Sequence, residues 1–212
     1  MDIKALIFIA LMILGIKNEI IAQSDCLDPI EEKDFRSSFY KLEYYYSIRN
    51  ILFEGLTYKP EIRYIHSFGL GSPLVLDIEY NDSETKYFLI LHTFSKRILF
   101  QKNIEEIQMH IYKKEISKES VDLIKELFET AIKNAKSGSN KMGLDGTSYY
   151  FFVNNNQILN GGTVWSPNKK SKMERLAKIG VELIKLTSSK TEIVEFDVKL
   201  TKEIINLNNE LK

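Results

Sequence analysis

The sequence contains a single cysteine, Cys26, among its 212 residues. One cysteine cannot form a disulfide within the chain, so the fold must be stabilised by its core alone. Asp25 stands directly before Cys26, whereas lipidated cysteines follow small residues. We therefore interpret Cys26 as an inert residue of a leader segment, with lipidation and pairing to another chain as the alternatives.

The chain also lacks an excess of charge of either sign, because 29 basic residues balance 29 acidic residues. Nucleic-acid-binding domains and proteins of anionic membrane surfaces carry clustered positive charge. We therefore expect no nucleic-acid partner and no electrostatic binding to a membrane.

The recognisable catalytic motifs are missing. There is no Gly-x-Ser-x-Gly nucleophile motif and no GxxxxGK[ST] phosphate loop. Gly69-Leu70-Gly71 lacks the third glycine of a dinucleotide loop and precedes a strand pattern instead of a helix. The sequence therefore predicts no cofactor.

The three histidines, His66, His92 and His110, all fall in strand patterns and form no close ligand pair. Two of them can share a metal only if their strands are neighbours. His92 lies between Leu91 and Phe94 and is more typical of a buried, hydrogen-bonded histidine. We expect no metal site.

Long apolar runs are absent except for one, Ala5 to Ile16, which has 12 residues without a charge. A spanning helix needs about 20 such residues, whereas the core of a secretory signal needs roughly 7 to 15. Lys4 precedes the run, and the small Ala22 fits the position before a cleavage site. The sequence predicts a signal peptide over residues 1–22, cleaved before Gln23, and a periplasmic or secreted protein with no membrane span after its removal. An uncleaved anchor and a buried first helix are the alternatives.

Residues 23–212 predict a single α+β domain: a mainly antiparallel sheet of five or six strands, packed by an N-terminal helix and by two or three helices of the C-terminal half. The first helix is expected over about 29–46, because Asp28 can cap it and Pro29 suits its first turn. Its apolar stripe comprises Phe35, Phe39, Leu42 and Tyr46.

Alternation of apolar and polar residues, or continuous apolar runs, then predict the strands. They fall over 62–68, 74–80, 87–94, 107–112, 149–153 and 158–165. Short turns between these segments favour antiparallel pairing.

Two later helices have clear starts. One is expected near Ser117 or Ser120, and the other at Ser166-Pro167 or at the capping box that begins with Ser171. The tail, 193–211, has both a strand-like alternation at its start and a longer helical spacing. We favour the helix there.

Four residues are candidates for binding. Asp145 lies in a Gly143–Thr147 loop, where it can bind a ligand or simply form a tight turn before the strand that contains Tyr149 and Tyr150. Trp165 ends a strand after Gly161-Gly162, two glycines that leave room for another group to approach. Its side chain is expected either to lie at the edge of the core or to anchor an interface.

The segment from Gly143 through Tyr149-Tyr150 to Trp165-Ser166-Pro167 resembles exported bacterial proteins without an assigned role. The resemblance covers about residues 138–186. It implies export and one intact domain, and it transfers no catalytic residue.

These observations favour a non-catalytic binding or interaction protein of the cell envelope, with a protein partner there. One specific version is an immunity or inhibitor protein that caps an exported toxin. The alternative is a hydrolase that uses Asp145 with Asp77 or Glu79 as acid and base. The oligomeric state is left open.

Overall fold

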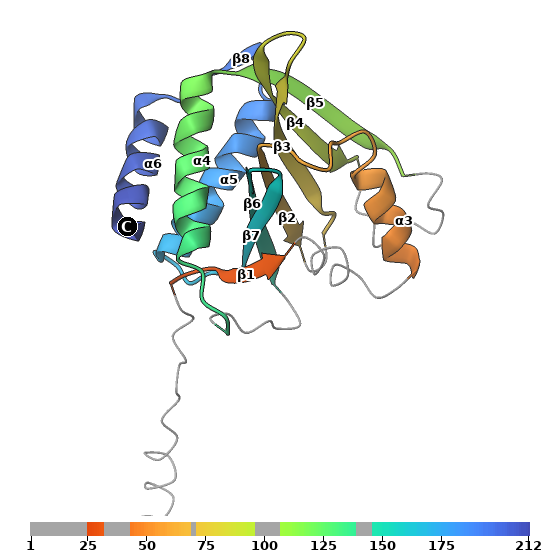
Figure 1. Ribbon diagram of the computed structural model, residues 1–212. Helices are drawn as coiled ribbons and strands as arrows, with labels where there is room; N and C mark the ends of the chain where they lie inside the picture. Colours follow the sequence, from red (N-terminus) through yellow and green to blue (C-terminus); the bar gives the residue numbers. More distant parts are fainter. Residues whose placement is uncertain (1–24, 32–42, 69–70, 96–106, 139–145) are drawn as a thin grey trace, which may run out of the picture.

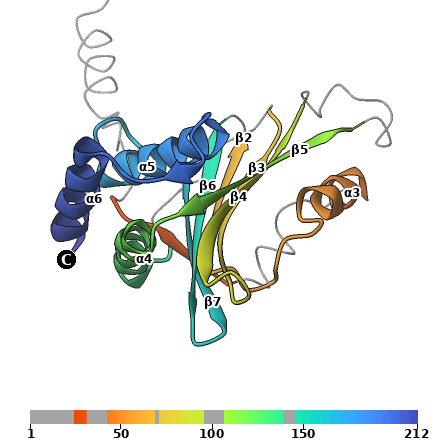
Figure 2. The same cartoon turned by 90° about the horizontal axis from the view of Figure 1, so that it is seen from above.

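The computed structural model describes residues 25–31, 43–68, 71–95, 107–138 and 146–212. These residues form one sheet and the helices that pack on its two faces (Figures 1 and 2). The strands are β1 (Asp28–Glu31), β2 (Ile62–Phe68), β3 (Leu74–Asn81), β4 (Lys86–Phe94), β5 (Met109–Ile116), β6 (Thr147–Asn155), β7 (Ile158–Trp165) and β8 (Ile193–Val194). The helices are α3 (Glu43–Leu52), α4 (Lys118–Lys133), α5 (Lys172–Ser188) and α6 (Val198–Leu211).

The sheet has the strand order β1-β7-β6-β2-β3-β4-β5-β8 within the described residues. Every pairing is antiparallel except that of β5 with β8, which is parallel. The predicted α+β class with a mainly antiparallel sheet is therefore confirmed, although eight strands replace the expected five or six.

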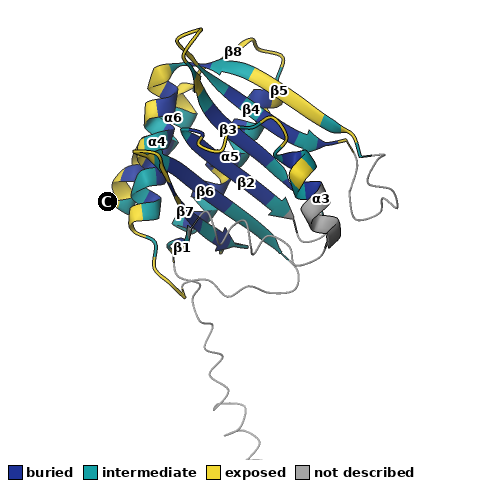
Figure 3. Cartoon of the chain, turned by 45° about the vertical axis from the view of Figure 1, so that its right-hand side comes forward, coloured by how far each residue is buried: buried dark blue, intermediate teal, exposed yellow. Residues whose placement is uncertain are grey.

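Helices α4, α5 and α6 cover one face of the sheet, and α3 lies on the other (Figure 2). The larger core lies under α4, α5 and α6 and includes Tyr64, Phe128 and Phe151. A smaller core lies on the α3 side and includes Ile48, Leu52 and Phe152. Figure 3 shows this burial concentrated in the central strands, while exposed residues follow the outer part of β5.

The helix predicted over 29–46 is wrong at its start, because residues 28–31 are a strand paired with β7. Non-local packing decides this. Leu27 is completely buried, and a Cβ on Gly162 would lie 2.7 Å from its side chain. Pro29 is tolerated because β1 is an edge strand. The expected stripe residues Phe35, Phe39 and Leu42 lie outside the described residues, and the helix that follows begins at Glu43.

The later helix starts are confirmed. The Ser117 hydroxyl accepts a hydrogen bond from the Ser120 amide at 3.2 Å, and the Ser171 hydroxyl accepts one from the Glu174 amide at 3.0 Å. These contacts are N-caps, which satisfy amides that the helix itself leaves unpaired. The alternative start at Ser166-Pro167 is wrong.

The tail is a helix as favoured, but only from Val198 onwards. Asp197 caps it by accepting a hydrogen bond from the Leu200 amide at 2.7 Å. Ile193–Val194 instead pairs with β5 as β8. The predicted signal peptide, residues 1–22, lies outside the described residues. No helix among the described residues is long and apolar enough to cross a membrane.

Candidate functional site

The two predicted tyrosines lie on opposite faces of the sheet, because they are consecutive in β6. Tyr149 stacks on His66 under α5, with 4.7 Å between ring centroids. Tyr150 belongs to the smaller core on the α3 side and is 9% exposed. The two rings therefore do not contribute to one surface.

Trp165 shares the α3 side of the sheet with Tyr150, as the register pairs it with Ser148 and pairs Thr163 with Tyr150. Its indole lies over Gly146, where an added Cβ would meet indole carbons at 2.5 Å. Asp145 lies outside the described residues. A binding role for these four residues stays a prediction.

The space beside Gly161-Gly162 is filled by the chain itself. A Cβ on Gly161 would lie 2.4 Å from the Phe152 ring, and a Cβ on Gly162 would lie 2.7 Å from Leu27. The expectation that these glycines leave room for a partner is therefore wrong. They instead allow one side chain to pack on each face of β7.

The histidines do not gather at one site. His66 and His110 point to the helix-covered face from β2 and β5, which two strands separate, and His92 points to the α3 side. Burial lowers the pKa of His66 to about 4. His92 is 2% exposed and its Nδ1 donates to the Leu52 carbonyl at 2.9 Å, which confirms the predicted buried, hydrogen-bonded histidine. No metal-binding group of three or more side chains occurs in the part of the chain that the structure describes.

The carboxylates of the alternative hydrolase, Asp77 and Glu79, do lie on one face of β3. Asp77 is completely buried and pairs with Arg63 through two hydrogen bonds, at 2.8 Å from Nε and 2.5 Å from Nη2. Burial raises the pKa of Asp77, and the Arg63 guanidinium opposes that rise. The Glu79 carboxylate accepts a hydrogen bond from the Thr57 amide at 3.1 Å, and burial raises the pKa of Glu79. This arrangement suits a structural ion pair better than an acid and base open to a substrate.

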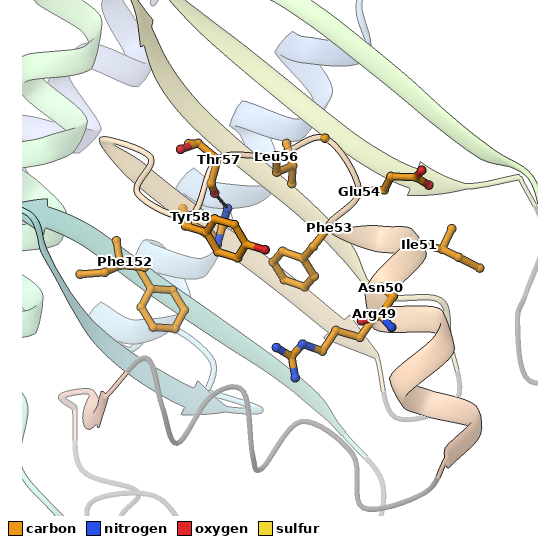
Figure 4. A pocket seen from close by; sticks show the side chains of 12 residues that line it. Arg49, Asn50, Ile51, Phe53, Glu54, Leu56, Thr57, Tyr58 and Phe152 are labelled. Carbon is orange, nitrogen blue, oxygen red and sulfur yellow. Dashed lines mark hydrogen bonds between the residues drawn. The ribbon is translucent and has the colours of Figure 1, made fainter.

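Arg63 of this ion pair also lines a cavity of about 670 Å³, which we call the α3 cavity (Figure 4). The end of α3 and the segment that follows it form one side, and β2, β6 and β7 form the other. Its lining residues are Arg49, Asn50, Ile51, Phe53, Glu54, Gly55, Leu56, Thr57, Tyr58, Arg63, Phe152 and Leu159. The size falls within the range of ligand pockets, roughly 300–1,000 Å³.

Local backbone contacts shape the segment that borders the cavity. After α3, the Phe53 amide donates to the Arg49 carbonyl at 3.0 Å, and the Leu56 amide donates to the Phe53 carbonyl at 3.2 Å. Gly55 adopts a φ of 79°, which glycine accommodates without steric cost and which turns the chain out of the helix.

Arg63 connects this segment to the sheet. Its Nη2 also donates to the Thr57 carbonyl at 2.8 Å, and its guanidinium carbon lies 5.0 Å from the centre of the Phe53 ring. One buried cation therefore satisfies Asp77, positions Thr57 and supports an aromatic wall of the cavity. None of the sequence motifs pointed to this cavity.

A second cavity, of about 470 Å³, lies between α5 and α6. Arg175 lines it and donates to Glu203 at 2.7 Å and to Glu210 at 2.6 Å, which fastens α6 to α5. Arg175 and Glu203 of this lining therefore stabilise the packing of α6 against α5.

No protein-family model matches this chain, and neither a curated protein nor a solved structure matches it. The resemblance noted for residues 138–186 stays a prediction.

Proposed function

We propose that this chain is an exported binding protein of the cell envelope that engages a protein partner at the α3 cavity and catalyses no reaction. The α3 cavity carries the proposal, because aromatic and aliphatic side chains line it together with polar ones. Binding sites of this kind are concave and mostly apolar, with a few polar groups that give orientation.

The buried titratable groups on the α3 side of the sheet support binding over catalysis. Asp77 is held in a two-point ion pair, and His92 is 2% exposed with its Nδ1 bonded to the Leu52 carbonyl. An acid or base has to reach the substrate directly or through one water. Asp77 instead fixes Arg63, which lines the cavity, and His92 fixes the end of α3 through Leu52.

Tyr58 gives the cavity a rim suited to a macromolecule. Its side chain lines the cavity and is nevertheless 73% exposed. Tyrosine is enriched among the residues that dominate the energy of protein interfaces. A partner that covers Tyr58 while inserting a side chain into the cavity fits this arrangement, and an immunity or inhibitor protein that caps an exported toxin is one form of it.

A photo-cross-linking experiment tests the site. With p-benzoylphenylalanine at position 58, irradiation in the native envelope is expected to give one dominant adduct, identified by mass spectrometry. The same group at Val198, which is 71% exposed on α6, is the matched control and is expected to give none. Equal adducts from both positions, or none from position 58, would contradict binding at the α3 cavity.

Export makes a separate prediction. Mass analysis of the chain isolated from its native envelope or medium should show an N-terminus at Gln23, because Ala22 fits the small residue that a signal peptidase requires. Ala22→Phe should leave the precursor uncut. A native chain that retains Met1 would overturn the cleaved signal peptide.

A further inference from the structure

The turn between β3 and β4 contains the only Asn-x-Ser/Thr sequence of the chain, Asn81-Asp82-Ser83. Enzymes that attach oligosaccharides to exported proteins act on an asparagine that is followed two positions later by serine or threonine, with any residue except proline between them. Asp82 is the residue between, so the sequence requirement is met. Because so short a motif also arises by chance, the position and geometry of Asn81 decide whether it suits an acceptor.

The turn lies where a large enzyme can reach it in the folded chain. It joins two strands at one end of the sheet, at the top of the molecule in Figure 1. Residues 82–86 are all exposed, and Asn81 has intermediate exposure at the end of β3. The Asn81 Nδ2 donates to the exposed Glu84 carboxylate at 2.8 Å, so the nitrogen that would carry a sugar lies at the surface. An oligosaccharide there extends into solvent and displaces no part of the core, as is typical of glycans on surface loops of secreted proteins.

Hydrogen bonds hold the Asn81 amide in a conformation that favours reaction at its nitrogen. Its Oδ1 accepts from the Ser83 amide at 3.0 Å and from the Ser83 hydroxyl at 2.7 Å. The backbone contact alone makes an Asx turn, which many asparagines form. The hydroxyl contact is additional and requires serine or threonine at position 83. Because both donors draw electron density toward Oδ1, they make the Nδ2 protons more acidic and ease the loss of one when Nδ2 forms a new bond.

We propose that Asn81 is an N-glycosylation site of the exported chain. The donor is a lipid-linked oligosaccharide, in which C1 of the first sugar is joined to the diphosphate of a polyprenyl carrier. The Asn81 Nδ2 forms a bond to C1, the C1–O bond to the diphosphate breaks, and the polyprenyl diphosphate leaves with the bonding electrons. Nδ2 gives up one proton to a base of the transferase. This inference goes beyond binding at the α3 cavity and rests only on the export part of the proposed function.

Mass spectrometry of the full chain isolated from its native envelope or medium tests the inference. The intact mass is expected to exceed that of residues 23–212 by the mass of an oligosaccharide. Electron-transfer fragmentation of the peptide that contains Asn81 should place the added mass on that residue. Asn81→Gln, produced in the same cells, should lose the added mass completely.

Two substitutions at position 83 test the role of the hydroxyl. Ser83→Ala should remove the modification although Asn81 is still present, whereas Ser83→Thr should retain it. Asn156→Gln is the matched control and should leave the added mass unchanged. Asn156 is likewise exposed in a turn between two strands, β6 and β7, but Ile158 stands where the motif requires a hydroxyl.

A native chain that begins at Gln23 and has its unmodified mass would overturn glycosylation and leave export standing. An added mass that survives Asn81→Gln would also overturn the inference, because another residue would then carry it. A chain that retains Met1 and carries no sugar would overturn both glycosylation and the export on which it rests. Binding at the α3 cavity is measured separately, through the adduct at position 58, so its success or failure is distinguished from these outcomes.

Discussion

Asp77→Ala is expected to lower the free energy of unfolding by about 3–5 kcal/mol, because it leaves the Arg63 guanidinium buried without its counter-charge. Asp77 is completely buried and Arg63 is 6% exposed, so water reaches Arg63 only through the α3 cavity and is a weaker partner than the carboxylate. Urea denaturation of the wild-type chain and the variant measures the difference.

Two further variants show whether the ion pair itself is responsible. Replacing both residues, with Arg63→Met and Asp77→Leu, should cost less than Asp77→Ala alone, because no unpaired charge stays in the core. Asp122→Ala removes the partner of Lys118 in a surface pair whose side chains are 58% and 63% exposed. It should change stability far less. A loss for Asp77→Ala no larger than that of Asp122→Ala would contradict a structural role for the buried pair.

The same ion pair connects stability to the proposed site. Arg63 holds the Thr57 carbonyl at 2.8 Å and supports the Phe53 ring, so the loss of Asp77 should also loosen the segment that borders the α3 cavity. Hydrogen exchange of residues 53–58 should then be faster in Asp77→Ala than in Asp122→Ala.

Features that depend on a few neighbouring residues were predictable from the sequence. The caps at Ser117 and Ser171 are examples, since the hydroxyl and the amide that it accepts from are three residues apart. The alternation of residues 62–68 similarly predicted a strand with Tyr64 and Arg63 on opposite faces.

Features that depend on a distant partner were not predictable. Asp28-Pro29 has the local pattern of a helix start, yet this segment pairs with β7 as a strand and packs against the glycines of β7. The alternation of Val194, Phe196, Val198 and Leu200 was visible in the sequence. The strand is limited to Ile193–Val194, however, by pairing with β5, about eighty residues earlier. Local propensity is a weak guide when a distant strand supplies the hydrogen bonds.

The α3 cavity depends partly on features that were predictable from neighbouring residues and partly on contacts between distant segments. Arg63 and Asp77 each lie between apolar residues of their strands, which was a signal that each needs a buried partner. The strand alternation places both on the side opposite Tyr64 and Leu76. Their direct pairing, however, depends on the register of β2 against β3, and the cavity depends on where α3 crosses the sheet. Neither relation is encoded within a short window of sequence.

Substitution of Gly180 is expected to have the second large effect on stability, because α5 approaches the sheet closely at this residue. A Cβ built on Gly180 would lie 2.3 Å from the Tyr64 ring. Tyr64 cannot move aside: it is completely buried, its hydroxyl donates to the Ala177 carbonyl at 3.2 Å, and its ring centroid lies 5.3 Å from that of Phe151. Helix propensity alone would make almost any residue more stabilising than glycine at this position. The contact with Tyr64 predicts the opposite, a loss of stability.

Gly180→Val should therefore lower the free energy of unfolding by about 3 kcal/mol through overpacking against Tyr64. Lys178→Val, at an exposed position of the same helix, is the control for the propensity of valine and should cost far less. Tyr64→Ala combined with Gly180→Val should cost less than the sum of the single changes, because the smaller side chain vacates the space that valine needs. Urea denaturation of the wild-type chain, the three single variants and the double variant measures these differences. Equal losses for the two valine variants would show that α5 does not depend on this contact.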